Sequence, residues 1–380
     1  MEKITTVVIG AGYRGRRLIE LLGAAGCFRV TGVFDPALPA DFPLPQGAVG
    51  YARGAEDYRR MLAEQCPRLV VIASPWQYHI PQAMTCAGAG CHIALEIRGG
   101  LALGEYDGLT RLAREKGVRI YPLENTVFMR ENMALFEMVR QEVFGEIVAL
   151  RGGYRHDLRD LLVADDGRLG NPHKPEGVWR SHFYTTENGD LYPTHGLAPL
   201  CLAAGIGRTD RIVRLTSFAS KACGLRDFIR RRGGDASLTV TQGDIVVTQL
   251  ETERGVLLTL THDTTLPRPR SLDFELQGTK GVWRGEFRKI YVEGRSPQEQ
   301  WEDDTPYVQA YEHPFWRRWG EEALQADAHH QGMDYVMLRA LAADLQGEER
   351  YPICPEDLTL WTSVSPWSKQ SIAERRTLTF

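Results

Sequence analysis

The chain has 380 residues, a length that predicts about two domains, and its 43% hydrophobic and 25% charged residues are typical of a globular protein. Forty-five Lys and Arg residues against 49 Asp and Glu residues give a net charge of −4, so no basic field favours nucleic acid or an anionic membrane. Seven cysteines without a CxxC pair argue against a zinc knuckle or a disulfide framework. We therefore predict no metal and a small-molecule partner.

The first residues lead directly into a short apolar run, without the basic and long apolar segments of a signal peptide. No run approaches the ~18 consecutive apolar residues of a membrane span. These features predict a cytoplasmic protein that does not bind membranes.

Short β-branched runs alternate with helical stretches in the first third of the chain. We expect strands at residues 5–9, 30–34, 69–73, 93–95 and 119–121, with helices at 16–22, 57–64, 77–89 and 103–116 between them. This α/β alternation predicts a Rossmann doubly wound parallel sheet that binds its ligand beyond the carboxyl ends of the strands. We expect this first domain to occupy residues 1–124.

The pattern changes after a helix predicted at residues 131–142. We expect strands at residues 147–150, 212–218, 245–250, 256–261, 272–276 and 289–292, without regular intervening helices. Residues 125–380 therefore predict an α+β domain with an open, mainly antiparallel sheet. The polar segment 154–194 is predicted as a functional loop, and helices at 332–345 and 355–372 are expected to pack back near the domain junction.

A glycine-rich turn follows the first predicted strand. Gly10, Gly12 and Gly15 form G-x-G-x-x-G, and the helix that begins here offers free amides to a pyrophosphate. Asp35 ends the next predicted strand, where its carboxylate would accept hydrogen bonds from ribose hydroxyls and repel a 2′-phosphate. NAD is therefore the predicted cofactor in preference to NADP, although the adjacent Arg14 would weaken that preference.

Polar groups also follow the later strands of the predicted sheet. Trp76 and His79 come after the third strand, Glu96 after the fourth and Asn125 after the fifth. We assign the first pair to cofactor packing, while noting that a histidine at a helix start often serves as a cap. Because parallel strands end at one edge, these groups indicate a common site.

The predicted loop of the second domain concentrates side chains suited to proton transfer and sugar binding. They are Tyr154, His156, Asp157, Arg180, His182, Tyr192 and His195. A solvated loop with capping residues is the alternative interpretation. Imidazole titrates near neutral pH, and a tyrosine hydroxyl can relay a proton to it.

Several longer motifs resemble a known family. They are Leu123-Glu124-Asn125, Gly152-Gly153-Tyr154-Arg155-His156-Asp157, Asn188-Gly189-Asp190-Leu191-Tyr192-Pro193-Thr194-His195-Gly196, Leu266-Pro267-Arg268-Pro269 and Gly332-Met333-Asp334. The chain resembles the NAD-dependent α-N-acetylgalactosaminidase family of glycoside hydrolases, within the Gfo/Idh/MocA superfamily of glucose-fructose oxidoreductase and inositol dehydrogenase. Dehydrogenases of that superfamily often have Glu-Lys-Pro where this chain has Glu96-Ile97-Arg98, and the glycosidase family also lacks the lysine.

The resemblance implies roles for individual positions. Cofactor contacts are implied for Gly10, Gly12, Tyr13, Arg14, Gly15, Asp35, Trp76, His79, Glu96, Ile97, Asn125 and Tyr192. Substrate contacts are implied for Tyr154, Arg180, Tyr192, Pro193, Thr194 and His195. Arg270 stands where the family motif Leu-Pro-Arg-Pro-Tyr has a tyrosine that touches substrate, so we expect Arg270 to contact the sugar and change specificity.

The implied reaction is hydrolysis of a glycoside by transient oxidation at C3, elimination, addition of water and return of the hydride, with His195 and Tyr192 as the catalytic pair. An NAD-dependent sugar or polyol dehydrogenase is the first alternative, and a non-catalytic nucleotide- or sugar-binding sensor is the second. The resemblance also implies a homo-oligomer formed through the sheet of the second domain.

Overall fold

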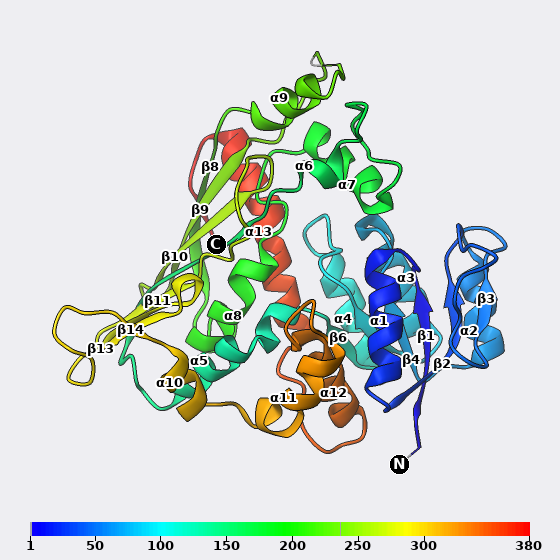
Figure 1. Cartoon of the computed structure of the whole chain (residues 1–380), viewed down its shortest axis with the longest axis horizontal. Helices are drawn as coiled ribbons and strands as arrows, with labels where there is room; N and C mark the ends of the chain where they lie inside the picture. The colour runs from blue at the N-terminus through cyan, green and yellow to red at the C-terminus, as the bar shows by residue number, and fades with distance from the viewer. Residues whose placement is uncertain (1, 236) are drawn as a thin grey trace. The chain divides into compact units, whose positions relative to one another are not determined.

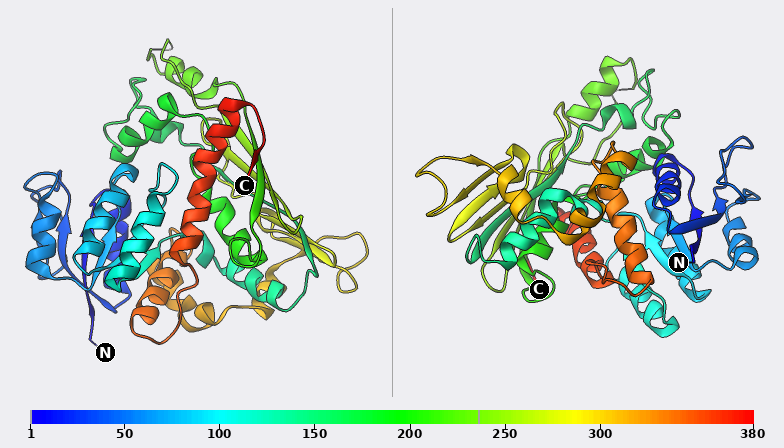
Figure 2. Two further views of the ribbon diagram at one scale, coloured as in Figure 1. Left: turned by 180° about the vertical axis from the view of Figure 1, so that it is seen from behind. Right: turned by 60° about the horizontal axis from the view of Figure 1, so that its bottom comes forward.

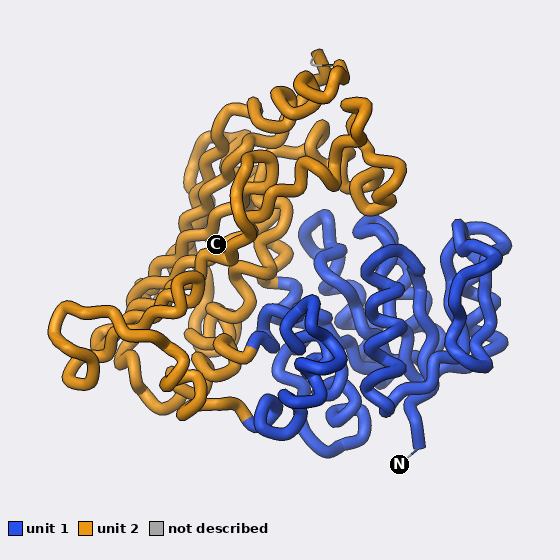
Figure 3. Tube along the Cα trace, in the orientation of Figure 1, with its two compact units in different colours: residues 1–129, 314–359 blue, residues 130–313, 360–380 orange. Residues whose placement is uncertain are grey.

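The computed structural model describes residues 2–235 and 237–380, and the chain divides into two compact units (Figure 3). Unit 1 consists of Met1–Met129 and Pro314–Thr359, and unit 2 of Arg130–His313 and Leu360–Phe380. The predicted division at residue 124 assigns residues 314–359 to the second domain, whereas their contacts group them with unit 1.

Unit 1 is built on a six-stranded parallel sheet with the order β3-β2-β1-β4-β5-β6 (Figure 1). The strands are β1 (Ile4–Ile9), β2 (Phe28–Phe34), β3 (Val49–Tyr51), β4 (Leu69–Ile72), β5 (His92–Leu95) and β6 (Ile120–Pro122). This order is that of a Rossmann sheet, as the sequence predicts. The order in which the chain adds strands switches from one side of β1 to the other between β3 and β4, while all strands stay parallel. Val7, Val8 and Ile9 are fully buried, as an unbroken apolar run in a parallel sheet requires.

Helices complete unit 1. The crossover helices are α1 (Tyr13–Ala24), α2 (Asp57–Gln65), α3 (Trp76–Gly88) and α4 (Glu105–Lys116), followed by the short η1 (Asn125–Phe128). The later segment adds α11 (Pro314–Ala326), α12 (Met333–Leu345) and the start of α13 (Pro355–Glu374). The indole nitrogen of Trp316 in α11 donates a hydrogen bond to the Phe128 carbonyl at 2.9 Å, which ties this segment to η1.

Unit 2 contains a nine-stranded sheet with the order β14-β13-β12-β11-β7-β10-β9-β8-β15. The strands are β7 (Ile147–Arg155), β8 (Ile212–Ala219), β9 (Ile245–Thr252), β10 (Leu257–Asp263), β11 (Glu275–Gly278), β12 (Gly281–Arg284), β13 (Lys289–Val292), β14 (Glu302–Asp303) and β15 (Leu378–Thr379). Only β7 and β10 pair in parallel among the described strands of this sheet, so the prediction of a mainly antiparallel sheet is confirmed.

Helices between the strands of unit 2 correct the predicted absence of such helices. They are α6 (Arg159–Leu162), α7 (Pro175–Thr186), α8 (Thr194–Ala204), α9 (Gly224–Arg231) and α10 (Thr305–Ala310). The helices predicted at residues 131–142 and 355–372 are confirmed as α5 (Arg130–Arg140) and α13. Figures 1 and 2 show α8 and α13 on the same face of the sheet. Segment 154–194 is therefore not the long loop that its polar composition predicts, because Pro175 starts α7 and Phe183 and Tyr184 bury its inner face.

One strand begins later than predicted. Residues 272–276 were expected to be extended, but β11 starts at Glu275. Asp273 has a left-handed backbone with φ of 54°, and its carboxylate accepts hydrogen bonds from Arg151 and Arg155. Such a conformation interrupts a strand. Within residues 2–235 and 237–380, no helix combines the length and apolar character needed to cross a bilayer.

Candidate active site

The glycine turn after β1 is shaped by two close backbone approaches. Gly10 has φ of 94°, and a Cβ there would lie 2.7 Å from the Ala73 backbone at the end of β4. A Cβ on Gly15 would lie 1.9 Å from the Gly10 carbonyl oxygen. By contrast, a Cβ on Gly12 would meet no described atom within 4 Å. The first and third glycines thus serve packing, while the second leaves open space at the start of α1.

That open space has the features of a dinucleotide cradle. Gly12 is the N-cap of α1, so the first amides of the helix face the space without a side chain to cap them. Asp35 lies at the end of β2, where its carboxylate accepts hydrogen bonds of 2.9 Å from the amides of Ala11 and Ala37. These bonds fix the carboxylate beside the turn, as ribose recognition requires.

We expect Gly12→Val to weaken NAD binding roughly tenfold or more without unfolding the protein, because the new side chain would fill the cradle. The Gly12 backbone, with φ of −65° and ψ of −170°, accepts a side chain without strain. Gly23→Val, also in α1 with nothing within 4 Å of its Cβ, is the matched control. NAD content and calorimetric titration measure the effect, and wild-type affinity in Gly12→Val would contradict the assignment.

Residues that follow β4 contact residues that follow β5. The Trp76 indole is buried and donates a hydrogen bond to the Ile97 carbonyl at 3.3 Å. His79 is 1% exposed, its Nε2 lies 2.6 Å from the Ser74 carbonyl, and burial lowers the pKa of its imidazole to about 4. His79 is therefore neutral at neutral pH and ties the start of α3 to the end of β4.

Arg14 is held by two carboxylates of unit 1. Its guanidinium donates to Glu96 and, in a bidentate arrangement, to Asp334 in α12. Burial opposes the charge, but Asp334 and Glu96 outweigh it and raise the pKa of Arg14 well above its usual range. This engagement leaves Arg14 poorly placed to bind a 2′-phosphate.

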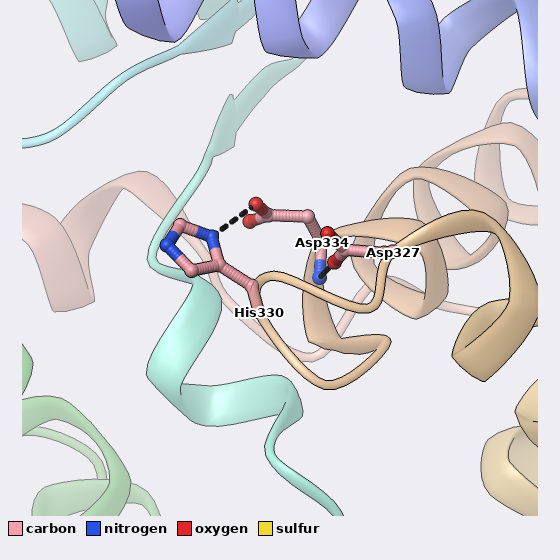
Figure 4. Close-up of side chains that lie close together, drawn as sticks. All are labelled: Asp327, His330 and Asp334. Atoms are coloured by element: carbon pink, nitrogen blue, oxygen red, sulfur yellow. Dashed lines mark hydrogen bonds and ion pairs between the residues drawn. The ribbon is translucent and has the colours of Figure 1, made fainter.

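Asp334 is the residue of this region to which the sequence assigned no role. It is fully buried, and besides Arg14 it accepts a hydrogen bond from Asn125 Nδ2 at 2.9 Å. Figure 4 shows its contact with His330, whose Nδ1 lies 2.6 Å from the carboxylate. Burial alone would raise the pKa of the Asp334 carboxyl, yet Arg14 and His330 hold it well below its usual range. Asp334 therefore links Arg14 of the glycine turn to Asn125, which starts η1 shortly after β6.

Asp327, His330 and Asp334 also form the only group of metal-ligating type detected in the described part of the chain, with ligand atoms within 4.8 Å of one another. Each carboxylate already pairs with an arginine, because Arg17 Nη2 lies 3.0 Å from Asp327. The positive charges of Arg14 and Arg17 beside these carboxylates disfavour binding of a metal cation. The ion pairs instead connect α1 to Asp327 and Asp334.

Asn125 carries a buried hydrogen-bond acceptor next to the candidate cofactor site. Asn125 Oδ1 is buried and accepts no hydrogen bond from any described residue, although Nδ2 of the same side chain is bonded to Asp334. A buried unpaired carbonyl oxygen is costly, and a bound molecule with N–H or O–H donors would satisfy it. The open glycine cradle, Asp35 and Asn125 together fit NAD.

Unit 2 brings together a cluster of aromatic and imidazole rings at the end of β7. The Tyr154 ring lies 4.6 Å from Tyr192, 5.6 Å from His195 and 6.1 Å from His156, and Tyr192 lies 4.7 Å from His195, measured between ring centroids. His262 in β10 stands opposite Tyr154 in the sheet register, with its ring 6.4 Å away. Below, this group of rings is called the Tyr154 cluster.

Arg180 joins the cluster from α7. Its guanidinium carbon lies 5.5 Å from the centre of the Tyr192 ring, and Nη2 forms an ion pair of 2.6 Å with Glu176 one turn earlier. Burial opposes the charge, but Glu176 helps to raise the pKa of Arg180 above its usual range. Arg180 thus presents a fixed cation beside the rings.

Three glycines set the distance between α8 and β7. A Cβ on Gly152 would lie 2.0 Å from the Gly196 carbonyl oxygen, and a Cβ on Gly196 would lie 2.2 Å from the Gly153 amide nitrogen. The first turn of α8 therefore rests directly on the β7 backbone. This contact is what carries His195 to Tyr154.

We expect Gly196→Ala to lower kcat/KM roughly a hundredfold, because the methyl group would push α8 and His195 away from β7. NAD content should stay at the wild-type level, since the glycine turn, Asp35 and Asn125 are unchanged. Gly88→Ala, at the end of α3 with nothing within 4 Å, is the control. Unchanged turnover in a folded Gly196→Ala protein would contradict this role.

Two residues predicted with the cluster have other contacts. Asp157 forms a bidentate pair with Arg159, two residues on, and His182 is exposed with its ring against Phe183. Pro193 is the N-cap of α8, and the buried Thr194 hydroxyl has no hydrogen-bond partner among the described residues.

The comparisons with known proteins agree with both halves of this description. The family profile described as "Oxidoreductase family, NAD-binding Rossmann fold" matches residues 4–123. A solved scyllo-inositol dehydrogenase from Lactobacillus casei, with bound NAD(H) and scyllo-inositol, is 14% identical and has a TM-score of 0.67 over 100% of this chain and 99% of that chain. The N-terminal region is thus an NAD-binding Rossmann domain of the oxidoreductase type.

The rest of the chain gives the family. The profile described as "Glycosyl hydrolase 109, C-terminal domain" matches residues 128–379. A glycosyl hydrolase family 109 protein of Stenotrophomonas maltophilia is 34% identical, covering 98% of this chain and 87% of its own. An alpha-N-acetylgalactosaminidase of Tannerella forsythia is also 34% identical, covering 95% of this chain and 79% of its own.

The chain belongs to glycosyl hydrolase family 109. Together with the Rossmann domain, this membership makes it an NAD-dependent glycoside hydrolase, as the sequence predicts.

Proposed function

We propose that the protein cleaves a glycoside bound at the Tyr154 cluster, with His195 and Tyr192 as the proton-transferring residues and Arg180 as a sugar-binding residue. The support is the packing of the cluster, in which the His195 and Tyr192 rings lie 4.7 Å apart at the start of α8. A tyrosine hydroxyl next to an imidazole suits proton relay near neutral pH.

The observation that carries this proposal is the state of the carboxylates around the cluster. Glu176 pairs with Arg180 at 2.6 Å, Asp157 with Arg159 at 2.7 Å, and Asp263 with Arg268 at 2.7 Å. Most glycosidases use two carboxylates across the scissile bond, and NAD-dependent hydrolysis is an exception. The cluster offers histidine and tyrosine as acid–base groups, and these three carboxylates are paired with arginines. This arrangement favours NAD-dependent hydrolysis.

The division of labour follows from the side chains. When bound, NAD+ supplies a reversible hydride acceptor, so that a carbon–oxygen bond of the sugar breaks without net oxidation. His195 and Tyr192 move the protons, one at the C3 hydroxyl and the other at C2. The Tyr154 and Tyr192 rings offer a surface to the sugar, and Arg180 donates hydrogen bonds to its hydroxyls.

Aryl glycosides assayed with and without added NAD test the proposal. We expect release of the aglycone without accumulation of NADH. A conventional dehydrogenase would accumulate NADH, and a non-catalytic sensor would produce neither change.

Two further parts of the account remain predictions. The homo-oligomer through the unit 2 sheet is tested by light scattering of the purified protein. Fractionation of cells that produce the protein tests the cytoplasmic location.

A further inference from the structure

Arg270 precedes and His156 follows a residue of one isolated backbone bridge in unit 2. Ser271, the neighbour of Arg270, pairs with Arg155 through two backbone hydrogen bonds of 2.8 and 3.1 Å, which form this antiparallel bridge. The bridge does not continue beyond this pair, because the His156 amide bonds to the Asp263 carbonyl instead. Arg270 and His156 are the next residues on the two bridged segments, which brings them close together in unit 2.

The neighbouring arginines are paired, whereas Arg270 is not. Arg155 pairs with Asp273, Arg268 with Asp263 and Arg180 with Glu176. Arg270 is exposed and forms no ion pair or side-chain hydrogen bond with any described residue. The edge of the cluster therefore carries a positive charge that no carboxylate of the protein neutralises.

The electrostatics of His156 agree with this placement. Burial lowers the pKa of its imidazole, and the charges of Arg270 and then Arg180 lower it further. Both guanidinium groups thus act on the same ring, whose centroid lies 6.1 Å from that of Tyr154. Asp157 acts on the same imidazole in the opposite direction, and Arg180 is paired with Glu176, so Arg270 supplies the positive charge that no carboxylate of the described residues pairs with.

We propose that the Tyr154 cluster binds glycosides whose sugar carries an anionic group, a carboxylate or a sulfate ester, and that Arg270 binds this group. The inference rests on the proposed function, because it takes the cluster as the sugar site. A guanidinium donates two parallel hydrogen bonds to either oxyanion, whereas a neutral acetamido sugar has no group that uses the fork. Arg270 is the available fork, since Arg180 is already paired.

Calorimetric titration of the NAD-loaded protein with a hexuronic acid, a hexose sulfate and the matching neutral hexose tests the proposal. We expect one anionic sugar to bind roughly tenfold to a hundredfold more tightly than the neutral sugar, and Arg270→Gln to abolish that preference. The two anionic probes distinguish carboxylate from sulfate recognition. Arg254→Gln, which removes an exposed arginine at the opposite end of β10, should keep the preference.

Three results would overturn the proposal. They are an unchanged preference in Arg270→Gln, tighter binding of the neutral hexose by the wild type, and no measurable binding of either anionic sugar. The same proteins assayed on aryl glycosides separate this inference from the proposed function. If the wild type and Arg270→Gln hydrolyse neutral glycosides equally well and neither prefers an anionic sugar in binding, only the anion site is contradicted. If the wild type prefers an anionic sugar in binding but hydrolyses no glycoside, only the proposed function is contradicted.

Discussion

His195→Ala is expected to lower kcat by roughly a hundredfold to ten-thousandfold, the usual contribution of a general acid or base. Tyr192→Phe should lower kcat within the same range, because the hydroxyl is removed while the ring contact of 4.6 Å with Tyr154 is kept. NAD content should be unchanged in both variants, since the glycine turn, Asp35 and Asn125 are intact and Tyr192→Phe keeps the aromatic ring. Steady-state kinetics on the best aryl glycoside and NAD quantification after denaturation measure the two effects.

His182→Ala is the matched control for these variants. It removes an exposed imidazole of α7 whose ring packs against Phe183, outside the ring contacts of the Tyr154 cluster. The control should retain nearly wild-type turnover. Near-wild-type turnover in a folded His195→Ala protein would remove His195 from the mechanism.

Asp334→Ala is expected to destabilise unit 1 by about 3–5 kcal/mol, the usual result of removing one partner of a buried ion pair. The side chain is fully buried, and its loss leaves Arg14, Asn125 and His330 each without one hydrogen-bond partner. Because Arg14 belongs to the glycine turn, NAD affinity should fall as well. Urea unfolding followed by fluorescence, together with NAD titration, measures both effects.

Glu253→Ala provides the exposed counterpart of this experiment. Glu253 pairs with Arg211 at 2.8 Å, and the two side chains are 58% and 64% exposed. Ion pairs of this kind contribute little to stability, so the unfolding midpoint should stay near that of the wild type. If Asp334→Ala unfolds at the same urea concentration as Glu253→Ala, the buried network does not stabilise unit 1.

Local sequence patterns predicted most of unit 1. Each strand of the Rossmann sheet except β3 is marked by a short buried β-branched or apolar run, and Gly10, Gly12 and Gly15 lie within six residues of one another. Such features depend on neighbours in the chain, so a single sequence displays them. The three residues of β3 form too short a run to give a periodic signal.

Contacts between distant residues were not predictable in the same way. Arg14 and Asp334 are 320 positions apart, and nothing in the local sequence of either residue indicates the other. The motif Gly332-Met333-Asp334 drew attention to the region without indicating a partner. Likewise, Arg270 comes near His156 because Arg155 and Ser271 form a backbone bridge, which only the folded chain defines.

The candidate sugar site lies between these extremes. The sequence pointed to Tyr154 and Tyr192 in the polar segment 154–194 and to His195 directly after it. The structure places their rings together because the first turn of α8 rests on β7. The same segment misled the prediction of secondary structure. Its polar composition concealed α7, which carries Arg180 to the cluster.

The central claim is that the protein hydrolyses a glycoside while its NAD returns to the starting oxidation state. Proton NMR of the NAD-loaded protein with an aryl glycoside in D2O tests this most directly. We expect many molecules of aglycone per molecule of bound NAD, deuterium at C2 of the released sugar and no net NADH. Accumulation of NADH in step with an oxidised sugar, without release of aglycone, would contradict it.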